Sequence, residues 1–361
     1  MEDSEKYKGE LKTLEDAIIK DPDNPDNHND KANILVKMGL NNEAIKEYEI
    51  AIKLDPEIAG YYYNKGIAMQ NLKNYVGAII AYEKAIALEP EDPNFHFNRA
   101  TALDSIKRWD DAIKEYDEAI RLDPQKPYYY GNKGLALTDL QRYSEAVDEF
   151  NRAIKLEPKN SYYHYSKARA LNALKKYKEA ESEFQESTRL EPENSEFHFG
   201  RAEALNELKL YEEAIKEYGI SIQLDPNYMG AYYNRGLILS KLGRYNDAVK
   251  DFDAAIRLKR DNPGSYYNKA VALKHLGLYN EALNSINVIY NTDEVNVLLI
   301  YAELMFLLKK DREARKLLSE VFDEGNITEE DLCEAVNDQL QDKNSRHEEK
   351  VIKTIMKIYC K

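Results

Sequence analysis

Apolar residues recur along this chain at helical spacing, in short segments that polar turns separate. Two such stripes follow each other in residues 59–92, one at Tyr62, Gly66, Met69 and Leu72 and one at Tyr75, Ala78, Tyr82, Ala85 and Ile86. The polar turn Lys73-Asn74 lies between them. We therefore predict a pair of antiparallel helices, each too short to be stable in isolation.

The same pattern returns every 34 residues. Prolines occur at 22, 56, 90, 124, 158, 192 and 226, and alanines at 44, 78, 112, 146, 180, 214, 248 and 282. We number the positions of each repeat from 1 to 34 and place repeats 1 to 8 at 25–58, 59–92, 93–126, 127–160, 161–194, 195–228, 229–262 and 263–296. Neighbouring repeats must supply the burial that a single helix pair lacks, which predicts an elongated stack.

Small and aromatic residues hold fixed places within the repeat. Position 8 is Ala or Gly and position 20 is Ala in all eight repeats, which lets two helix axes approach closely. Position 24 is Tyr or Phe in the first seven repeats, and we expect this ring to fill the space between repeats. All 11 prolines lie in a connection or at the start of a predicted helix, where the missing N–H does no harm.

These positions resemble the tetratricopeptide repeat (TPR) family. The resemblance includes an aromatic residue or His at position 4, Leu or Met at 11, Ala or Ser at 27 and Pro at 32, and it covers about three quarters of the chain. It implies an all-α fold, a right-handed α-α superhelical solenoid of tandem helix pairs. It also implies that the first helix of each pair lines a concave groove, which binds a protein or peptide.

Both ends depart from the repeat pattern. We interpret residues 1–24 as an N-terminal half-repeat helix, 25–296 as the eight tandem repeats, 297–327 as a degenerate ninth repeat and 328–361 as C-terminal capping helices. Terminal repeats must cover an apolar face that would otherwise meet water, so atypical ends are expected. An alternative is that the last helix docks a partner.

Composition narrows the possible partners and the compartment. The net charge of -14 argues against nucleic acid and against anionic membrane surfaces, which both attract basic faces. Neither a signal peptide nor an apolar run long enough to span a membrane is evident, so we expect a soluble, cytoplasmic protein. The two cysteines, Cys333 and Cys360, are expected to be free thiols.

Comparing the repeats with one another suggests where a ligand binds. Positions 9 and 12 vary from repeat to repeat, whereas position 5 is usually aromatic and position 6 often Asn. The candidate peptide-binding residues in the groove are Asn64, Asn98, Asn132, Asn234, Asn268, Tyr63, Phe97, Tyr165, Phe199, Tyr233 and Tyr267. The aromatic residues could equally pack against a neighbouring helix. For the Asn residues we favour ligand contact, because Asn is a poor helix former without an evident packing role.

No motif for catalysis, metal binding or phosphate binding is present in the sequence. Four of the six histidines occupy position 4, where we expect them to pack against a neighbouring helix. Acidic residues recur at positions 19 and 23 and are expected to form a solvated outer face.

The leading hypothesis is a non-catalytic, cofactor-free scaffold that binds a protein or peptide in its groove. One alternative is a self-associating assembly protein, a possible homo-oligomer, that pairs through its C-terminal helix. Another is a regulatory TPR subunit of an enzyme complex.

Overall fold

The computed structural model describes residues 2–289, 295–310, 312–314, 316 and 333. Its contacts fall into two compact units, Met1–Pro192 and Glu193–Lys361, and each is treated by itself below. The sequence pattern had indicated no division at this point.

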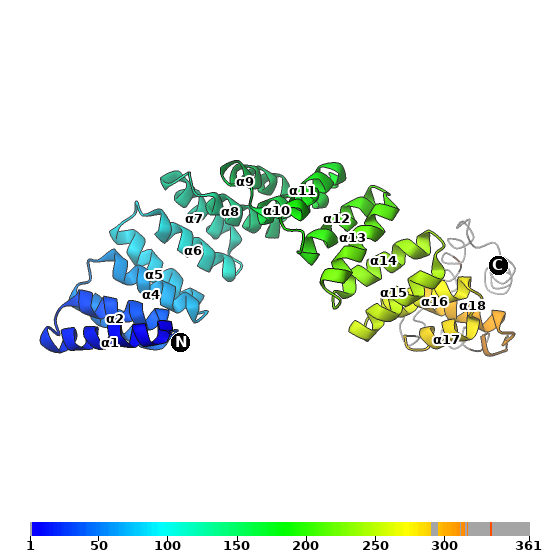
Figure 1. The fold of residues 1–361 in the computed structure, drawn as a ribbon, viewed down its shortest axis with the longest axis horizontal. Coiled ribbons are helices and arrows are strands. Elements are labelled where there is room, and N and C mark those ends of the chain that lie inside the picture. The colour runs from blue at the N-terminus through cyan, green and yellow to red at the C-terminus, as the bar shows by residue number, and fades with distance from the viewer. Residues whose placement is uncertain (1, 290–294, 311, 315, 317–332, 334–361) are drawn as a thin grey trace. The chain divides into compact units, whose positions relative to one another are not determined.

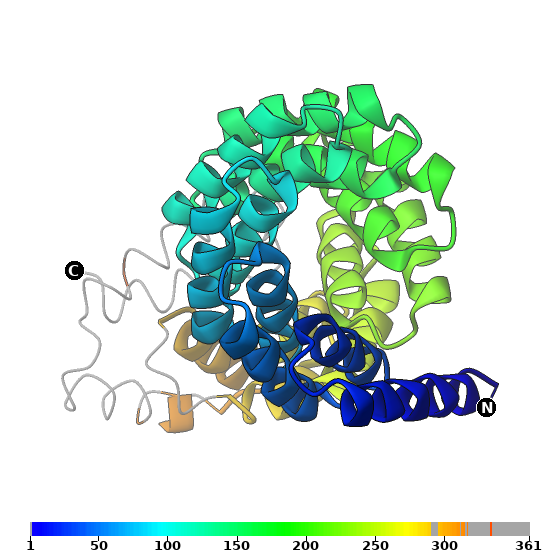
Figure 2. The ribbon, with the colours of Figure 1, turned by 90° about the vertical axis from the view of Figure 1, so that its left-hand side faces the viewer.

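In the first compact unit a single helix precedes five helix pairs (Figures 1 and 2). These helices are α1 (Glu2–Lys20), α2 (Pro25–Lys37), α3 (Asn41–Leu54), α4 (Ala59–Asn71), α5 (Tyr75–Leu88), α6 (Pro93–Ser105), α7 (Trp109–Leu122), α8 (Pro127–Asp139), α9 (Tyr143–Leu156), α10 (Ser161–Ala173) and α11 (Tyr177–Leu190). The second compact unit contains α12 (Ser195–Glu207), α13 (Tyr211–Leu224), α14 (Met229–Lys241), α15 (Tyr245–Leu258), α16 (Pro263–His275), α17 (Tyr279–Ile286) and α18 (Val295–Leu307).

Each predicted repeat is one of these pairs. The first helix covers positions 1–13 and the second positions 17–30, except that α17 ends early, at Ile286. Pro25, Pro93, Pro127 and Pro263 each begin a first helix. Every second helix from α3 to α15 ends one residue before an Asp, Glu or Lys in extended or irregular backbone. The helix pairs predicted from the apolar spacing are therefore confirmed.

The turn inside each pair depends on one residue with left-handed backbone, at position 15. That residue is Gly39, Gly243 or Gly277 in three repeats and a Lys or Gln in the others, such as Lys73 with φ 58°. The N–H of Asn74 donates to the Met69 carbonyl at 2.9 Å, which satisfies a carbonyl that the helix end leaves open. The turn thus fixes how the second helix folds back on the first.

The position-24 ring lies between the two helices of its own repeat. A Cβ atom added to Gly66 would sit 2.5 Å from the Tyr82 ring, and one added to Gly134 would sit 2.7 Å from the Phe150 ring. Both rings are almost completely buried. The ring also belongs to a buried cluster that includes the next repeat, as Tyr82 does with Leu103. Within its own pair, a small residue at position 8 opens the space directly beneath it.

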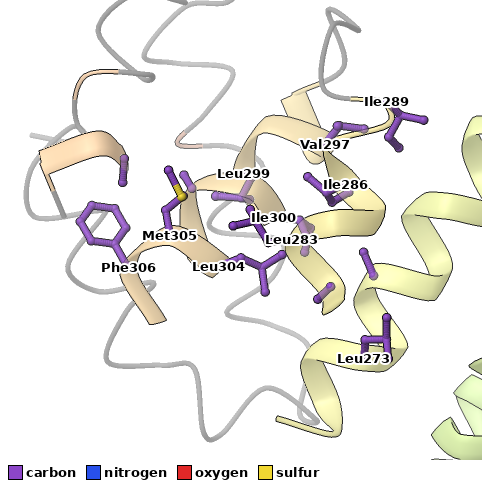
Figure 3. Packing of buried hydrophobic residues seen from close by; sticks show 14 residues of the cluster. Leu273, Leu283, Ile286, Ile289, Val297, Leu299, Ile300, Leu304, Met305 and Phe306 are labelled. Carbon is purple, nitrogen blue, oxygen red and sulfur yellow. The ribbon is translucent and has the colours of Figure 1, made fainter. Parts of the chain in front are cut away.

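Long aliphatic residues form the core of α16, α17 and α18, which Figure 3 shows in close-up. Leu283, Leu299, Ile300 and Leu304 are buried there, and Met305 and Phe306 border them. The helix α18 coincides with the first half of the predicted ninth repeat. The second half of that repeat lies mostly outside the described residues, and the predicted capping helices of residues 328–361 do so except at residue 333.

One expectation about cysteine is overturned. Cys333 is disulfide-bonded in the structure and is therefore not a free thiol. Distance along the sequence does not reveal which residues folding brings together, so spacing alone could not show this.

Candidate binding surface on the first helices

The first helices of successive repeats contact one another directly. In the first compact unit α2 contacts α4, α4 contacts α6, α6 contacts α8 and α8 contacts α10. These five helices therefore form one layer. We call its residues at positions 2, 5, 6, 9 and 12 the first-helix surface.

The aromatic residues at position 5 connect neighbouring repeats. The Tyr63 ring lies 5.8 Å from Tyr82 of its own repeat and 4.8 Å from Phe95, at position 3 of the next one. Phe97 repeats this arrangement, at 5.8 Å from Tyr116 and 5.0 Å from Tyr129. Aromatic pairs at such separations contribute beyond their buried area. Position 3 was not recognised from the sequence, although its aromatic residues in repeats 2 to 6 were a visible signal.

The other predicted aromatic residues are also half-buried. Tyr165 lies 5.8 Å from Phe184, Phe199 lies 5.6 Å from Tyr218, and Tyr233 lies 6.1 Å from Phe252. Tyr267 packs on the C-terminal core instead. Packing therefore accounts for one side of each ring, and a ligand could reach only the part that remains exposed.

Gly131 interrupts the aromatic row for a steric reason. A Cβ atom at this position would lie 2.5 Å from the Tyr163 ring of the following repeat. Tyr163 takes the space that an aromatic residue at position 5 fills elsewhere. The row therefore lacks an aromatic residue at Gly131 because the ring of the following repeat occupies the space.

The Asn residues at position 6 do have a structural role, which contradicts the premise that nothing in the packing explains them. The amide of Asn98 donates to the Tyr63 hydroxyl at 2.8 Å and to the Asn94 carbonyl at 2.9 Å. Asn268 bonds the Tyr233 hydroxyl and the Gly264 carbonyl in the same manner. Asn therefore recurs partly because its amide joins one first helix to the previous one.

The remaining Asn residues share only part of this pattern. Asn64 donates to Asn29 of the previous repeat at 3.0 Å, and Asn132 donates to the Tyr128 carbonyl at 2.8 Å. Asn234 lies beside the Tyr218 hydroxyl and bonds it. For Asn64, Asn98, Asn132 and Asn268 the amide nitrogen is thus used, while the amide oxygen accepts no hydrogen bond from any described residue.

Acidic residues at position 23 are not solvated, which corrects the expectation of an outer acidic face there. Glu149, Glu217 and Asp251 are each less than a tenth exposed. Their partners are the basic residues at position 7, which is Lys or Arg in all eight repeats. Arg235, for example, bonds both carboxylate oxygens of Asp251 at 2.7 Å. This regularity was visible in the sequence and was overlooked.

The position-7 residues also reach the preceding repeat. Lys133 contacts Glu149 of its own repeat at 2.8 Å and Asp117 of the previous one at 2.7 Å. Burial alone would lower the pKa of Lys133, but its hydrogen bonds to Asp117 and Glu149 outweigh burial and raise it. These cations are therefore committed to holding the helices together. Position-19 acids such as Glu145 are well exposed, as expected.

The histidines at position 4 are buried at the same junction. The Nδ1 atom of His96 lies 2.8 Å from Glu115, and its Nε2 atom lies 3.1 Å from the Pro90 carbonyl. His28 and His164 show the same two contacts. Because two acceptors face the two ring nitrogens of His96, its protonated imidazole is favoured, and the hydrogen bond to Glu115 raises its pKa. The expected packing of these histidines against a neighbouring helix is confirmed.

At the C-terminal end the variable face is covered. Lys274 occupies position 12 of repeat 8, yet it is buried and its Nζ atom contacts Glu303 of α18 at 2.8 Å. Lys274 was included in the variable stripe as a residue that could meet a ligand. Instead, α18 packs against α16 and takes this position into the core.

The described part of the chain contains neither a metal site nor a membrane-spanning helix. No group of three or more His, Cys, Asp or Glu residues there could hold a metal ion. None of the helices described is both long and apolar enough to cross a membrane.

The helix pairs recur every 34 residues, and within a pair a small residue lies beneath an aromatic ring. This is the architecture of a helical repeat protein. Models of the tetratricopeptide repeat match residues 59–92, 77–127, 132–189 and 230–262, and a TPR repeat model matches 32–73 and 204–243. The chain belongs to the tetratricopeptide repeat family, as the resemblance had implied.

Solved structures of TPR proteins share this fold. The C-terminal part of a TPR repeat-containing protein from Cytophaga hutchinsonii has 17% identity and a TM-score of 0.58, covering 66% of this chain and 97% of that one. A TPR protein from Parabacteroides merdae has 19% identity and a TM-score of 0.52, covering 71% and 98%. YrrB, described as a TPR protein with an unusual peptide-binding site, has 26% identity and a TM-score of 0.47, covering 52% and 97%. No curated protein sequence matches the chain.

Proposed function

We propose that the first-helix surface of α2, α4, α6, α8 and α10 binds an extended segment of a partner protein, without catalysis. The observation that carries this proposal is the set of hydrogen-bond acceptors left over along these helices. The amide oxygens of Asn64, Asn98 and Asn132 accept no bond from the described residues. They recur at one position of successive repeats, so they form a regular row.

A row of acceptors suits an extended chain, which presents an unpaired N–H at each residue except proline. The Asn172 oxygen on α10 is buried without a partner and adds to this supply. Aromatic rings beside the row offer apolar contact, and two of them are exposed, Tyr128 at 38% and Tyr162 at 55%. The Tyr128 ring, for example, stands edge-on to Phe97 at 5.0 Å, so it is held in place before a ligand arrives.

The test compares binding after equivalent substitutions on two surfaces. Short peptides are selected from a random library on the immobilised full chain, and their affinities are then measured by fluorescence anisotropy. The variant Asn98→Ala/Asn132→Ala is expected to bind the selected peptides about tenfold more weakly, because it removes two acceptors. Asn151 and Asn246 are exposed on the second helices α9 and α15 and provide the matched control variant Asn151→Ala/Asn246→Ala.

The control variant should bind as tightly as the unsubstituted chain. Circular dichroism must show that both variants keep their helix content. Equal affinities for all three proteins would remove the first-helix surface as the binding site. A loss confined to the control variant would instead place the ligand on the second helices.

A further inference from the structure

Two polar groups in repeat 3 are buried without hydrogen-bond partners, one at the first-helix surface and one behind it on the second helix. They are the hydroxyl of Tyr116 on α7 and the Oδ1 atom of Asp104 on α6. Tyr116 has no exposed surface, whereas Asp104 is half-buried, so its carboxylate borders the solvent. Leaving such groups unbonded costs free energy, and a native structure rarely does so without a reason.

The neighbouring repeats show how these groups are normally satisfied. The Tyr82 hydroxyl of repeat 2 donates to the Gln70 side chain at 3.0 Å, and Gln70 occupies position 12, as Asp104 does. In repeat 1 the Tyr48 hydroxyl donates to Asn33 at 2.7 Å. Only the third of these repeats combines an acidic residue at position 12 with an unbonded hydroxyl.

The charge around Asp104 is uncompensated. Asp104 forms no ion pair with any described residue, and the charge that acts on its carboxyl group is that of Asp139 on α8. Burial, and after it the negative charge of Asp139, raise the pKa of Asp104. The basic residue at position 7 of the same repeat, Arg99, is engaged with Glu115 at 2.9 Å.

We propose that Asp104, Asp139 and the Tyr116 hydroxyl form a site for the cationic side chain of a lysine or arginine in the bound segment. An ammonium or guanidinium group would neutralise Asp104 through a charge-assisted hydrogen bond, with Asp139 contributing from the adjacent helix. The buried hydroxyl would complete the donor and acceptor pairing. This assignment rests on the proposed function, because it names one feature of the segment that the first-helix surface binds.

The probes are two pools of short acetylated peptides with random flanks and one fixed central residue. That residue is lysine in the first pool and Nε-acetyl-lysine, which lacks the charge, in the second. The unsubstituted full chain is expected to bind the lysine pool about tenfold more tightly than the neutral pool. Asp104→Asn should bring this ratio close to one, and Tyr116→Phe should reduce it by a smaller factor.

A second readout separates binding from a structural role. Asp104→Asn removes an unpaired buried charge, so it should raise the thermal unfolding midpoint of the free chain while weakening the lysine preference. A residue that merely stabilised the fold would lower that midpoint when substituted. Asp110, exposed on the second helix α7, gives the matched control Asp110→Asn, which should leave the lysine preference unchanged.

Different failures can be told apart. Suppose that Asp104→Asn keeps the full lysine preference while Asn98→Ala/Asn132→Ala no longer binds either peptide pool. The cation site is then refuted, and the proposed function is supported. If the unsubstituted chain binds neither pool, both fall. If spermidine, a free polyamine, displaces the lysine pool equally well from the Asp104→Asn variant and from the unsubstituted chain, the cation site at Asp104 is overturned.

Discussion

The core inside the repeats and the core at the C-terminal end bury apolar surface by different means. In repeats 2 and 4 a glycine lies beneath a ring, Gly66 under Tyr82 and Gly134 under Phe150. Around α18 the buried residues are long aliphatic ones such as Leu299 and Leu304 (Figure 3). The difference follows from periodicity, because a repeat must present the same contact to each neighbour whereas an end has only one neighbour.

The same contrast applies to polar residues. Inside the repeats, ion pairs recur between positions 7 and 23, and the basic partner keeps some contact with solvent, as Arg99 does at 24% exposed in its pair with Glu115. In the C-terminal core, the ion pair between Lys274 and Glu303 does not follow the repeat pattern. Its two side chains are only 4% and 1% exposed. We therefore expect a single substitution to cost more at the end than within the stack.

The largest effect is expected for Lys274→Met, which removes the ammonium group that Glu303 contacts in the core. Removing one partner of a buried ion pair costs about 3–5 kcal/mol. The double variant Lys274→Met/Glu303→Leu should recover most of this loss, because it leaves no buried charge. Hydrogen exchange of α16 and α18 measures the local change. Equal protection in the single and double variants would contradict the account.

Gly66→Ala tests the contact inside a repeat. Its new methyl group would lie 2.5 Å from the Tyr82 ring, so the ring or helix must move, at a cost of about 1–3 kcal/mol. Gly60→Ala in the same helix meets nothing within 4 Å and should be neutral or slightly stabilising. Urea unfolding of the two variants provides the comparison. A similar loss in both would show that the Tyr82 contact is not tight.

The histidine junction predicts that stability depends on pH. The raised pKa of His96 and His164 means that their stabilisation is complete below the unfolded pKa and is lost as pH rises through the folded pKa. Tyr130 occupies the same position in repeat 4 and donates to the Pro124 carbonyl without titrating in this range. His96→Tyr/His164→Tyr should therefore flatten the fall in unfolding midpoint between neutral and mildly alkaline pH.

The carboxylates that pair with these histidines make stability depend on pH in the opposite direction, at acid pH. Burial would raise the pKa of Glu183, but hydrogen bonds from His164 and Lys167 outweigh burial and lower it. Its contribution is present above the unfolded pKa and is lost as pH falls through the folded pKa. Unchanged alkaline behaviour in the histidine variant would mean that these rings do not carry the charge assigned to them.

The smallest effect on stability is expected at the turn between the two helices of a repeat. Lys107 has φ 61°, a left-handed conformation in which glycine avoids the strain that a side chain brings. Lys107→Gly should stabilise the chain by about 0.5–1 kcal/mol, and Gly243→Lys, at the equivalent position, should destabilise it by a similar amount. Thermal unfolding of both variants measures the two signs. Shifts of the same sign would rule out backbone strain as the cause.

Much of the fold followed from the sequence alone. The period of 34 residues, the pairing of short helices and the small residues at positions 8 and 20 could all be recognised in the sequence. They are local or strictly periodic properties, and apolar spacing together with Pro and Gly placement determines them. The site was only partly predictable. The row at position 6 was identified, but its bonds to Tyr63 and Tyr233 were not.

By itself, then, the sequence determined that this protein is a stack of paired helices and which positions repeat within it. Only the tertiary structure decided which polar groups are satisfied, as the contrast between Tyr82, bonded to Gln70, and Tyr116, unbonded in the repeat that has Asp104 at position 12, shows. The physical reason is that a hydrogen bond between helices depends on distances that folding sets, and one-dimensional spacing records only neighbours along the chain.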